Sequence, residues 1–519
     1  MKVKLVERIW IKKNKKKVKH LTKLVYDLAH FRNLVLIFIH KYHEKSGKWV
    51  TSASVLYSIL ADKLNYSKTK DEKKLSRLKE IESNLDKELK EWLNKMREQK
   101  KKVDNNYLIQ QVLRQIEKDF RSYFNSIKEY YKNPDKFTGK PNPPKPKKLK
   151  NLHHFTVEFN ANVLKQEERK LRLRLRVNSK KWFTVKLSNK YKVSSVRLCY
   201  FLGGFYVDVV REVEIPEIKP LGNYKAGIDL NLDNMLVVTS TNPELPSFII
   251  SGKENKAFNQ WFNKLKSKYQ SEHDKIANEI EQLEKSGNNI PKELSDKEKE
   301  LRWKIRQLCI HRKKWFDNHF HRLTKYLALF LYYTGHNEVF IGNSALNAKQ
   351  NCNLSSKVAE KFVQIPFRNL IDKLKYKCEV MGIKVREISE EYTSKVSCVT
   401  NKIGRRIKRG LFKDLDLNKV FNADCNASFN ILKKGAKLPS LTKLFDMKIL
   451  FKKLCNPVRF GFFKFIEFVQ SVIPKSPSFW REIGDSPAPL GAGSNPVALI
   501  QLYQNTSFNN KRLHCYATG

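Results

Sequence analysis

Closely spaced pairs of cysteines are missing from this sequence. Its 8 cysteines are scattered, and no two of them form a Cys-x-x-Cys pair. This distribution argues against both a disulfide framework and a zinc ribbon. We therefore expect ordinary buried or free thiols and no bound zinc.

Long hydrophobic runs are missing as well. No stretch of about 18 consecutive apolar residues occurs, so we expect no membrane span and no membrane partner. The residues after Met1 do not form the apolar core of a signal peptide. We therefore expect the protein to work inside the cell.

Acidic residues are few. The 52 Asp and Glu residues are outnumbered by 102 Lys and Arg, which leaves a net charge of +50 spread along the whole chain. Such a chain repels itself unless a polyanion neutralises it. Nucleic acid is the predicted partner, because many phosphate contacts give tight, salt-sensitive binding. A generally basic or ribosome-associated protein is the alternative.

The 519 residues, 41% of them hydrophobic, are enough for several folded domains, and the first part of the chain predicts strands interrupted by helices. Residues 1–12 alternate in polarity as a strand does, and helical periodicity follows up to about residue 132. Within it, the run Leu75–Met96 predicts one long amphipathic helix. Prolines between residues 141 and 150 end the helical pattern. We predict a wedge-like β-barrel from residues 1–15 and 136–220, with a helical-bundle recognition domain, residues 16–135, inserted in it.

One strand of the predicted barrel carries a row of arginines. Leu171–Val177 alternates strictly, so its arginines share one face and its aliphatic side chains share the other. A basic sheet face suits the phosphate backbone of a nucleic acid. The residues predicted to bind there are Arg172, Arg174 and Arg176.

The part of the chain after Tyr224 mixes strands and helices. The pattern predicts a β-hairpin, a long helical hairpin, a strand, a helix, a strand, an irregular basic loop and a last helix. This order is typical of an α/β sheet of the RNase H type. We predict such a domain over residues 221–435, with a helical insertion at about 253–335. Residues 436–519 show no clear period, and we expect a partly disordered C-terminal extension.

Two aspartates far apart in the sequence are candidate metal ligands. Asp229 lies in a short apolar strand, and the Asp233-Asn234 pair behind it is typical of a tight hairpin turn. Asp424 lies at the start of the last predicted helix. A divalent metal ion needs carboxylates that distant elements bring together. The sequence therefore predicts that Asp229 and Asp424 meet in one site.

Three segments together resemble a known family. They are Gly227-Ile-Asp-Leu230 with its hairpin, Tyr392-Thr-Ser-Lys395, and Ala423-Asp-Cys-Asn-Ala-Ser-Phe-Asn-Ile431, in this order. They look like the RuvC-like domain of TnpB, the RNA-guided nuclease of OrfB-type transposons, which is related to type V CRISPR effectors. The resemblance extends over roughly residues 1–435. It implies an RNase H-like fold, a guide RNA held by the N-terminal domains, a double-stranded DNA target, and a prokaryotic, cytoplasmic and nucleoid-associated location.

Two features depart from the family pattern. The family has a glutamate at the end of the middle strand, where this chain has Gly342. The family also has two cysteine pairs after the Tyr-Thr-Ser motif, and this chain keeps only Cys398, since Cys425 belongs to the Asp424 motif. We therefore expect a degenerate zinc-ribbon insertion at about residues 394–420, without zinc.

A relocated acid is one way to replace the missing glutamate, because a two-metal site depends on where its carboxylates lie and not on which strand delivers them. The strand that begins at Lys384 is predicted to end in Glu390 and Glu391. Side chains alternate along a strand, so only one of the two can enter the site, and we predict Glu390. Two exposed strand-end charges are the alternative, and Glu338 and Glu360 are weaker candidates.

The resemblance and these residues together predict an RNA-guided, magnesium-dependent DNA endonuclease. Asp229, Glu390 and Asp424 are the predicted catalytic residues and would bind two Mg²⁺ ions through oxygen ligands alone. A guided DNA-binding protein that does not cut is the alternative, which the loss of the middle glutamate favours. A transposase that joins DNA itself is disfavoured, because no tyrosine or His-x-His nucleophile is evident.

The basic loop that precedes Asp424 is a further candidate for phosphate binding. A solvated loop without a specific ligand is the alternative. Its candidate residues are Arg405, Arg406, Lys408 and Arg409.

Overall fold

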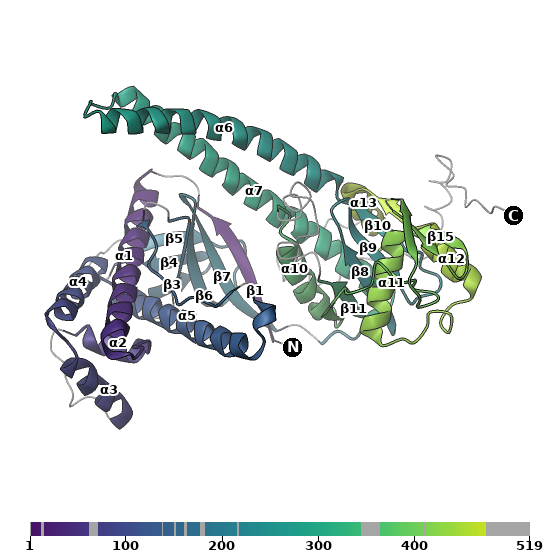
Figure 1. The fold of residues 1–519 in the computed structure, drawn as a ribbon, viewed down its shortest axis with the longest axis horizontal. Helices are drawn as coiled ribbons and strands as arrows, with labels where there is room; N and C mark the ends of the chain where they lie inside the picture. The colour runs from purple at the N-terminus through teal and green to yellow at the C-terminus, as the bar shows by residue number, and fades with distance from the viewer. Residues whose placement is uncertain are drawn as a thin grey trace. The chain divides into compact units, whose positions relative to one another are not determined.

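The computed structural model divides the chain into two compact units, Lys2–Glu214 and a second one from residue 215 onward. Figure 1 shows the elements of both. No helix in the described ranges is long and apolar enough to cross a membrane. The structure describes residues 2–11, 15–61, 71–137, 139–149, 152–159, 163–176, 182–214, 217–343, 364–408 and 410–473.

The first unit contains the predicted helical segment. The apolar faces of the helices in this segment pack with the strands of the unit in one buried core. The predicted helix over Leu75–Met96 is wrong as one element, because Asp86 caps a new helix by accepting a 2.8 Å hydrogen bond from the Leu89 N–H. The helices are α1 (Lys15–Ser46), α2 (Ala53–Ile59), α3 (Glu72–Ser83), α4 (Lys87–Val103), α5 (Asn106–Lys132) and the short 3₁₀ helix η2 (Pro134–Lys136).

The strands of the first unit form two separately hydrogen-bonded antiparallel sheets, in the orders β1-β7-β6-β2 and β3-β4-β5. The sequence predicts one barrel here, and closure of a barrel stays a prediction. Arg8 and Asp208 lie opposite each other in the register of β1 and β7 and form an ion pair at 2.7 Å. The strands are β1 (Lys2–Trp10), β2 (His154–Phe159), β3 (Leu164–Glu167), β4 (Lys170–Arg174), β5 (Trp182–Lys186), β6 (Val193–Phe201) and β7 (Gly204–Glu214).

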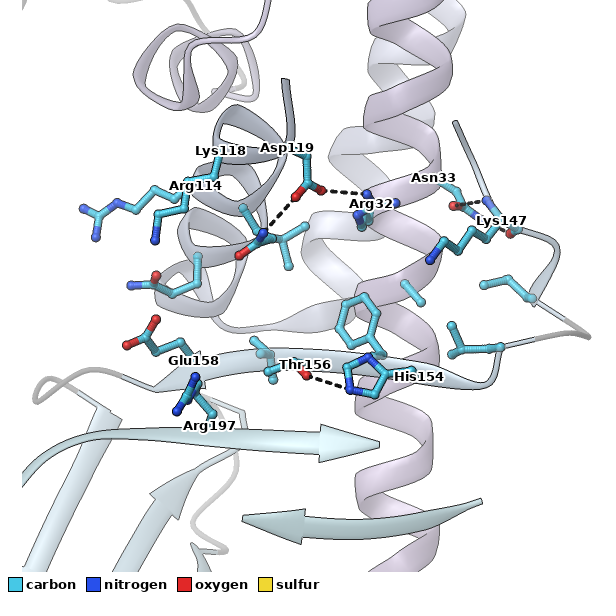
Figure 2. Close-up of a pocket in the computed structure, with 18 residues that line it drawn as sticks. Arg32, Asn33, Arg114, Lys118, Asp119, Lys147, His154, Thr156, Glu158 and Arg197 are labelled. Atoms are coloured by element: carbon cyan, nitrogen blue, oxygen red, sulfur yellow. Dashed lines mark hydrogen bonds and ion pairs between the residues drawn. The ribbon is translucent and has the colours of Figure 1, made fainter. Parts of the chain in front are cut away.

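A polar cavity of about 450 Å³ lies within this unit between α1, α5, β2, β6 and the segment before β2 (Figure 2). Asp119 on α5 pairs with Arg32 on α1 at 2.9 Å and accepts a 2.8 Å hydrogen bond from Gln115. Asn33 exchanges two hydrogen bonds with the backbone of Lys147, at 2.6 and 3.0 Å. These contacts fix two sides of the cavity.

The second unit is built on a six-stranded sheet in the order β12-β11-β8-β9-β10-β16. The strands β8, β9 and β10 are antiparallel neighbours, as the predicted hairpin requires, and β11 and β12 run parallel to β8. Its strands are β8 (Tyr224–Leu230), β9 (Asn234–Ser240), β10 (Phe248–Ser251), β11 (His336–Gly342), β12 (Lys384–Ile388) and β16 (Val458–Phe460).

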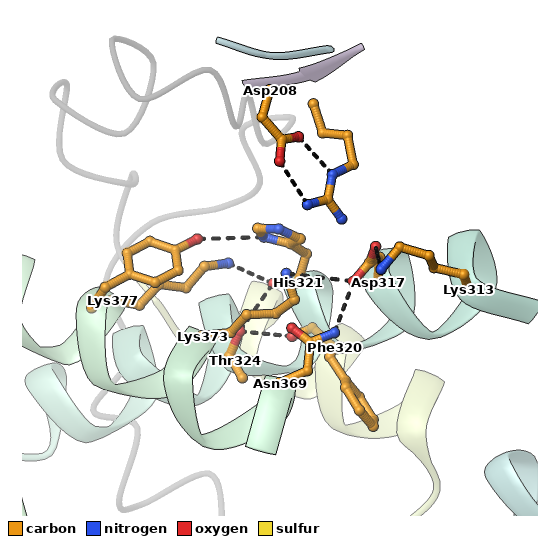
Figure 3. Close-up of polar contacts among 11 residues, drawn as sticks. Asp208, Lys313, Asp317, Phe320, His321, Thr324, Asn369, Lys373 and Lys377 are labelled. Atoms are coloured by element: carbon orange, nitrogen blue, oxygen red, sulfur yellow. Dashed lines mark hydrogen bonds and ion pairs between the residues drawn. The ribbon is translucent and has the colours of Figure 1, made fainter. Parts of the chain in front are cut away.

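Helices flank this sheet, and the two longest form the predicted helical hairpin between β10 and β11. Helix α10 is fastened to α7 by polar contacts (Figure 3): Asn369 donates to Asp317 at 2.8 Å, and the buried Lys377 donates to the carbonyl of His321 at 2.6 Å. The helices are α6 (Lys253–Lys285), α7 (Lys292–Tyr333), α10 (Phe367–Val380), α11 (Ala423–Ala436), α12 (Met447–Cys455) and α13 (Phe462–Val472).

The segment predicted as an irregular basic loop contains a small antiparallel sheet in the order β13-β14-β15. This difference has a local cause: Gly410, with φ +86°, lies between β13 and β14, where they turn back on each other. The strands are β13 (Arg405–Lys408), β14 (Leu411–Asp414) and β15 (Lys419–Asn422).

Candidate active site

Asp229 lies on the central strand β8, and its side chain is buried, with 4% of the residue exposed. The Asn231 amide donates a 2.6 Å hydrogen bond to Asp229 Oδ2. Strand β9 follows directly after the turn, so the predicted hairpin around Asp229 is confirmed. The hairpin therefore presents one oriented carboxylate from the middle of the sheet.

Asp424 lies in the first turn of α11, where Asn422 caps the helix by accepting 3.0 Å hydrogen bonds from the N–H groups of Asp424 and Cys425. This helix start matches the prediction from the sequence. Asn234, at the start of β9, donates a 2.6 Å hydrogen bond to Asp424 Oδ2. Arg406 approaches Asp424 Oδ1 at 3.5 Å from β13. The Asp424 carboxylate is therefore contacted from two sides.

Close packing of α11 on β8 brings the two aspartates together. The Ser428 hydroxyl hydrogen-bonds the carbonyls of Gly227 at 2.9 Å and Val237 at 3.0 Å. A Cβ atom on Gly227 would lie 2.4 Å from the Ser428 carbonyl oxygen, so a larger residue would push the helix away. The glycine before Ile228 and Asp229 is thus required by the approach of the helix that carries Asp424.

Glu390 lies two residues beyond the end of β12, and its side chain reaches back over β11. Ile388, the last residue of β12, is paired in register with Gly342, the last residue of β11. A Cβ atom on Gly342 would lie 2.1 Å from Glu390 Oε1 and 2.5 Å from its Cδ. The Glu390 carboxyl group therefore occupies the space in which a side chain at position 342 would begin.

The turn that holds Glu390 is tied to α11. The N–H and hydroxyl of Thr393 donate to the Glu390 carbonyl at 3.0 and 2.8 Å. Asn430 on α11 donates to the carbonyls of Thr393 at 2.9 Å and Val396 at 2.7 Å. Asn426, one turn earlier, donates to Val396 O at 2.8 Å and accepts from the Cys398 N–H at 2.8 Å. The helix that delivers Asp424 therefore also fixes the turn behind Glu390.

The three acids interact electrostatically. The pKa of Asp229 is raised well above its ordinary value, first by burial and then by the negative charges of Glu390 and Asp424. The hydrogen bond from Asn231 and the charge of Arg406 oppose this increase. As they are placed, no three carboxylate, imidazole or thiol groups of the described ranges lie close enough together to hold a metal ion.

Replacing Asp229 by Asn should stabilise the metal-free protein. The pKa of Asp229 is raised in the folded state, so ionisation of this group destabilises the fold. The protonated group contributes its full stability below the ordinary carboxyl pKa of about 3.9, and this contribution is lost as pH rises through the raised pKa. The asparagine of Asp229→Asn does not ionise and so does not destabilise the fold as pH rises. We therefore expect its free energy of unfolding to exceed that of the wild type by about 1–2 kcal/mol at neutral pH. Denaturant unfolding of both proteins in EDTA, at several pH values, measures it. A difference that does not grow from pH 4 to pH 8 would contradict the crowding of charges.

The other acidic candidates lie elsewhere. Glu338 is at the beginning of β11, where it pairs with Lys225 at 3.0 Å and Arg386 at 3.2 Å. Glu391 is exposed, and Glu360 lies outside the described residues. The strand expected to include Glu390 and Glu391 ends earlier, at Ile388. Of the three candidate glutamates that the structure describes, Glu390 is the one whose charge acts on Asp229.

The predicted arginine face of β4 needs correction. The strand ends at Arg174, so Arg176 is not part of it and instead donates to Asp27 on α1 at 2.8 Å. Arg172 pairs with Glu167 at 2.9 Å, and the Arg174 guanidinium lies 5.9 Å from the centre of the Trp182 ring. Arg172 and Arg174 share a face, and binding of nucleic acid by any of the three stays a prediction.

The predicted basic loop residues fall on β13. Arg405, Arg406 and Lys408 are all exposed, and Arg409 lies outside the described residues. Arg406 contacts Asp424, so the small sheet places a cation beside the acids. The sequence predicts phosphate binding here, and the contact with Asp424 is a finding that the sequence did not indicate.

Two turns in the segment predicted as a degenerate zinc ribbon are joined by hydrogen bonds to one carboxylate. Asp414 is 1% exposed and accepts bonds from Thr400 Oγ1 at 2.9 Å and from the N–H groups of Asp416 and Leu417 at 3.0 Å each. The nearby Cys398 is buried, which raises the pKa of its thiol to about 12. The absence of zinc remains an expectation.

The cavity of the first unit is strongly basic. Figure 2 shows Arg114, Lys118 and Arg197 gathered on one side of it, together with Glu158. Arg32 and Lys147 also line the cavity. The five cationic side chains outnumber the two carboxylates of Asp119 and Glu158, so the lining suits an anionic group. Composition predicts a polyanionic partner, and the sequence did not indicate this cavity.

Comparison with known proteins gives one family match. Residues 367–431 match the family described as the Cas12f1-like TNB domain. This segment begins with α10 and includes the turn of Glu390, the small sheet and Asp424. The match covers this segment only, and membership of the chain in the TnpB family stays a prediction. No curated protein sequence matches the chain.

Solved structures give low similarities. A Cas12f1–sgRNA–target DNA complex is 15% identical, with 83% of this chain and 100% of that chain covered and a TM-score of 0.30. A CRISPR–Cas12f ternary complex is 15% identical, with 80% and 82% covered and a TM-score of 0.30. A Cas12i–crRNA–dsDNA complex is 10% identical, with 74% and 56% covered and a TM-score of 0.27. Scores this low do not show a shared overall fold.

Proposed function

We propose that the protein is an RNA-guided DNA endonuclease, related to type V effectors and TnpB, that cuts at a RuvC-like site made of Asp229, Glu390 and Asp424. The observation that carries the proposal is the Glu390 carboxyl group directly over Gly342, in the place of the side chain that the family motif has there. The order β10-β9-β8-β11-β12, with α11 against β8 and β9, is that of an RNase H-type sheet. The matched family segment contains two of the three acids.

The donor chemistry of the three acids suits hard divalent cations. Their donors are oxygen atoms only, which suits Mg²⁺. The pKa of Asp229 is raised first by burial and then by the negative charges of Glu390 and Asp424, which a cation would compensate. When bound, two Mg²⁺ ions would supply an activated water molecule and stabilise the leaving oxygen of a phosphodiester. Asp229, Glu390 and Asp424 would hold them, Asn231 and Asn234 orient two of the carboxylates, and Arg406 is placed to receive the phosphate charge.

In this proposal guide RNA supplies the sequence specificity. The protein would hold the RNA–DNA heteroduplex through its backbone, as in other guided effectors. The net charge of +50 and the basic cavity of the first unit support extensive phosphate contact. A nuclease-inactive guided DNA-binding protein is the second candidate, favoured by Gly342 in place of the middle glutamate and by the loss of the cysteine pairs.

The direct test uses the RNA that copurifies with the protein from cells. Its sequence should contain a constant part and a variable part, and the purified complex should cut plasmid DNA that matches the variable part. Cutting should require Mg²⁺ and stop in EDTA. Guided binding of the matching plasmid without cutting would support the second candidate, and random cellular RNA would contradict both.

Affinity for this RNA should fall steeply with salt. Each phosphate contact adds about 0.7–0.9 to the slope of log affinity against log salt, so a chain with many contacts should show a large negative slope. Removing two cavity cations in Arg114→Ala/Lys118→Ala should make the slope shallower by about 1.4–1.8. Filter binding between roughly 50 and 300 mM KCl measures both effects. A flat response would contradict distributed phosphate contact.

A further inference from the structure

The segment after α11 lies beyond the resemblance to the family, yet it contributes a strand to the sheet of the candidate active site. Strand β16 runs parallel to β10, with Arg459 paired in register with Ile249. Val458 and Phe460 are buried, with 4% and 2% exposed, whereas Arg459 between them is exposed. The alternation of the strand therefore directs Arg459 away from the core.

The Arg459 side chain reaches the neighbour of an active-site carboxylate. Its guanidinium Nη1 donates a 3.1 Å hydrogen bond to Asn234 Oδ1, and Asn234 Nδ2 donates a 2.6 Å bond to Asp424 Oδ2. A guanidinium can only donate, so it must face the amide oxygen. With the oxygen occupied, the amide NH₂ group must point to Asp424. Arg459 thereby sets the orientation in which Asn234 can bind the carboxylate.

The strand that carries Arg459 is firmly held. The Val458 N–H donates to the Ser247 carbonyl at 2.9 Å. The buried Lys453 donates to the carbonyls of Asn242 and Leu245, the first at 2.6 Å. Phe465 of α13 stacks on Phe248 of β10, with ring centres 5.9 Å apart. Contacts on both sides of Arg459 thus fix its backbone relative to the sheet.

We propose that Arg459 is a positioning residue for Asp424, acting through Asn234, and that residues 447–472 are therefore part of the cutting machinery. The inference rests on the proposed function, since Asp424 matters as a metal ligand. Groups that orient a metal ligand from outside the coordination shell typically contribute 10- to 100-fold to metal affinity or activity. Arg406, which contacts the other oxygen of Asp424 at 3.5 Å, does not replace this contact.

The test is a double-mutant cycle in which the affinity for Mn²⁺ is measured on the purified protein without guide RNA or DNA. Asn234→Ala and Arg459→Ala should each weaken Mn²⁺ binding about 10-fold. The double variant should bind Mn²⁺ no more weakly than Asn234→Ala alone, because both changes remove the same chain of hydrogen bonds to Asp424. Lys464→Ala, an exposed cation on α13, should bind as the wild type does. Thermal unfolding checks that each variant is folded.

The outcomes separate this inference from the proposed function. Wild-type affinity in Arg459→Ala, or additive losses in the double variant, would overturn the positioning role. If Mn²⁺ affinity differs among the variants as predicted but the wild type cuts no guided target, the positioning role is supported and the proposed nuclease activity is contradicted. A wild type that binds no Mn²⁺ would end both.

Discussion

Glu390→Ala should abolish Mg²⁺-dependent cutting of a guided DNA target while leaving affinity for guide RNA unchanged. The side chain supplies one of the three acids of the proposed site, and its loss leaves the carboxylates of Asp229 and Asp424 for two cations. We expect the cleavage rate to fall by more than about 100-fold, which is the largest effect typical of groups outside the coordination shell. Cleavage rates under single-turnover conditions measure it, with RNA affinity determined on the same preparations.

Glu391→Ala is the matched control for this prediction. It removes the same chemical group from the next residue, which is exposed, and should cut at the wild-type rate. If Glu391→Ala loses activity and Glu390→Ala keeps it, the acid has been assigned to the wrong glutamate. If both variants cut normally, neither glutamate belongs to the site.

Gly342→Ala should reduce cutting by about 100-fold although it adds only one uncharged methyl group. The new Cβ would lie 2.1 Å from Glu390 Oε1, so the carboxyl group must move. The far end of a glutamate is flexible, and we therefore expect little change in the free energy of unfolding. A misplacement of about 1 Å can cost 100-fold in rate. Parallel measurement of cleavage rate and unfolding temperature tests both statements.

Gly139→Ala is the control for Gly342→Ala, because a Cβ at that glycine meets nothing within 4 Å. It should change neither the cleavage rate nor the unfolding temperature. A fully active Gly342→Ala protein would show that Glu390 does not need the position it has above β11.

Local patterns in the sequence predicted much of the second unit. The short apolar strand around Asp229 and the Asp233-Asn234 turn predict the hairpin, and the last predicted helix starts close to Asp424, as the structure has it. Hydrogen bonds between near neighbours fix these elements, so short stretches of sequence contain the necessary information. The pairing of the two aspartates follows from Gly227, which lets α11 approach β8.

Contacts between distant residues could not be predicted in the same way. Glu390 was placed on a strand, but the strand ends at Ile388, and the turn beyond it depends on Asn430. Strand β16 has three residues, too few for a period, and joins the sheet through pairing with β10. The alternation predicts Arg176 on the same strand as Arg174, yet β4 ends at Arg174 and Arg176 donates to Asp27. In each case a long-range contact overrides the local pattern.

The central claim is that Glu390 supplies the acid that the family places at position 342, and exchanging the two positions tests it most directly. Single-turnover cleavage would be compared in the wild type, Glu390→Ala, Gly342→Glu and the double variant Gly342→Glu/Glu390→Ala. We predict that each single change stops cutting, the second because its side chain collides with Glu390, and that the double variant regains it. Wild-type cutting by Glu390→Ala, or a double variant as inactive as Glu390→Ala, would contradict the claim.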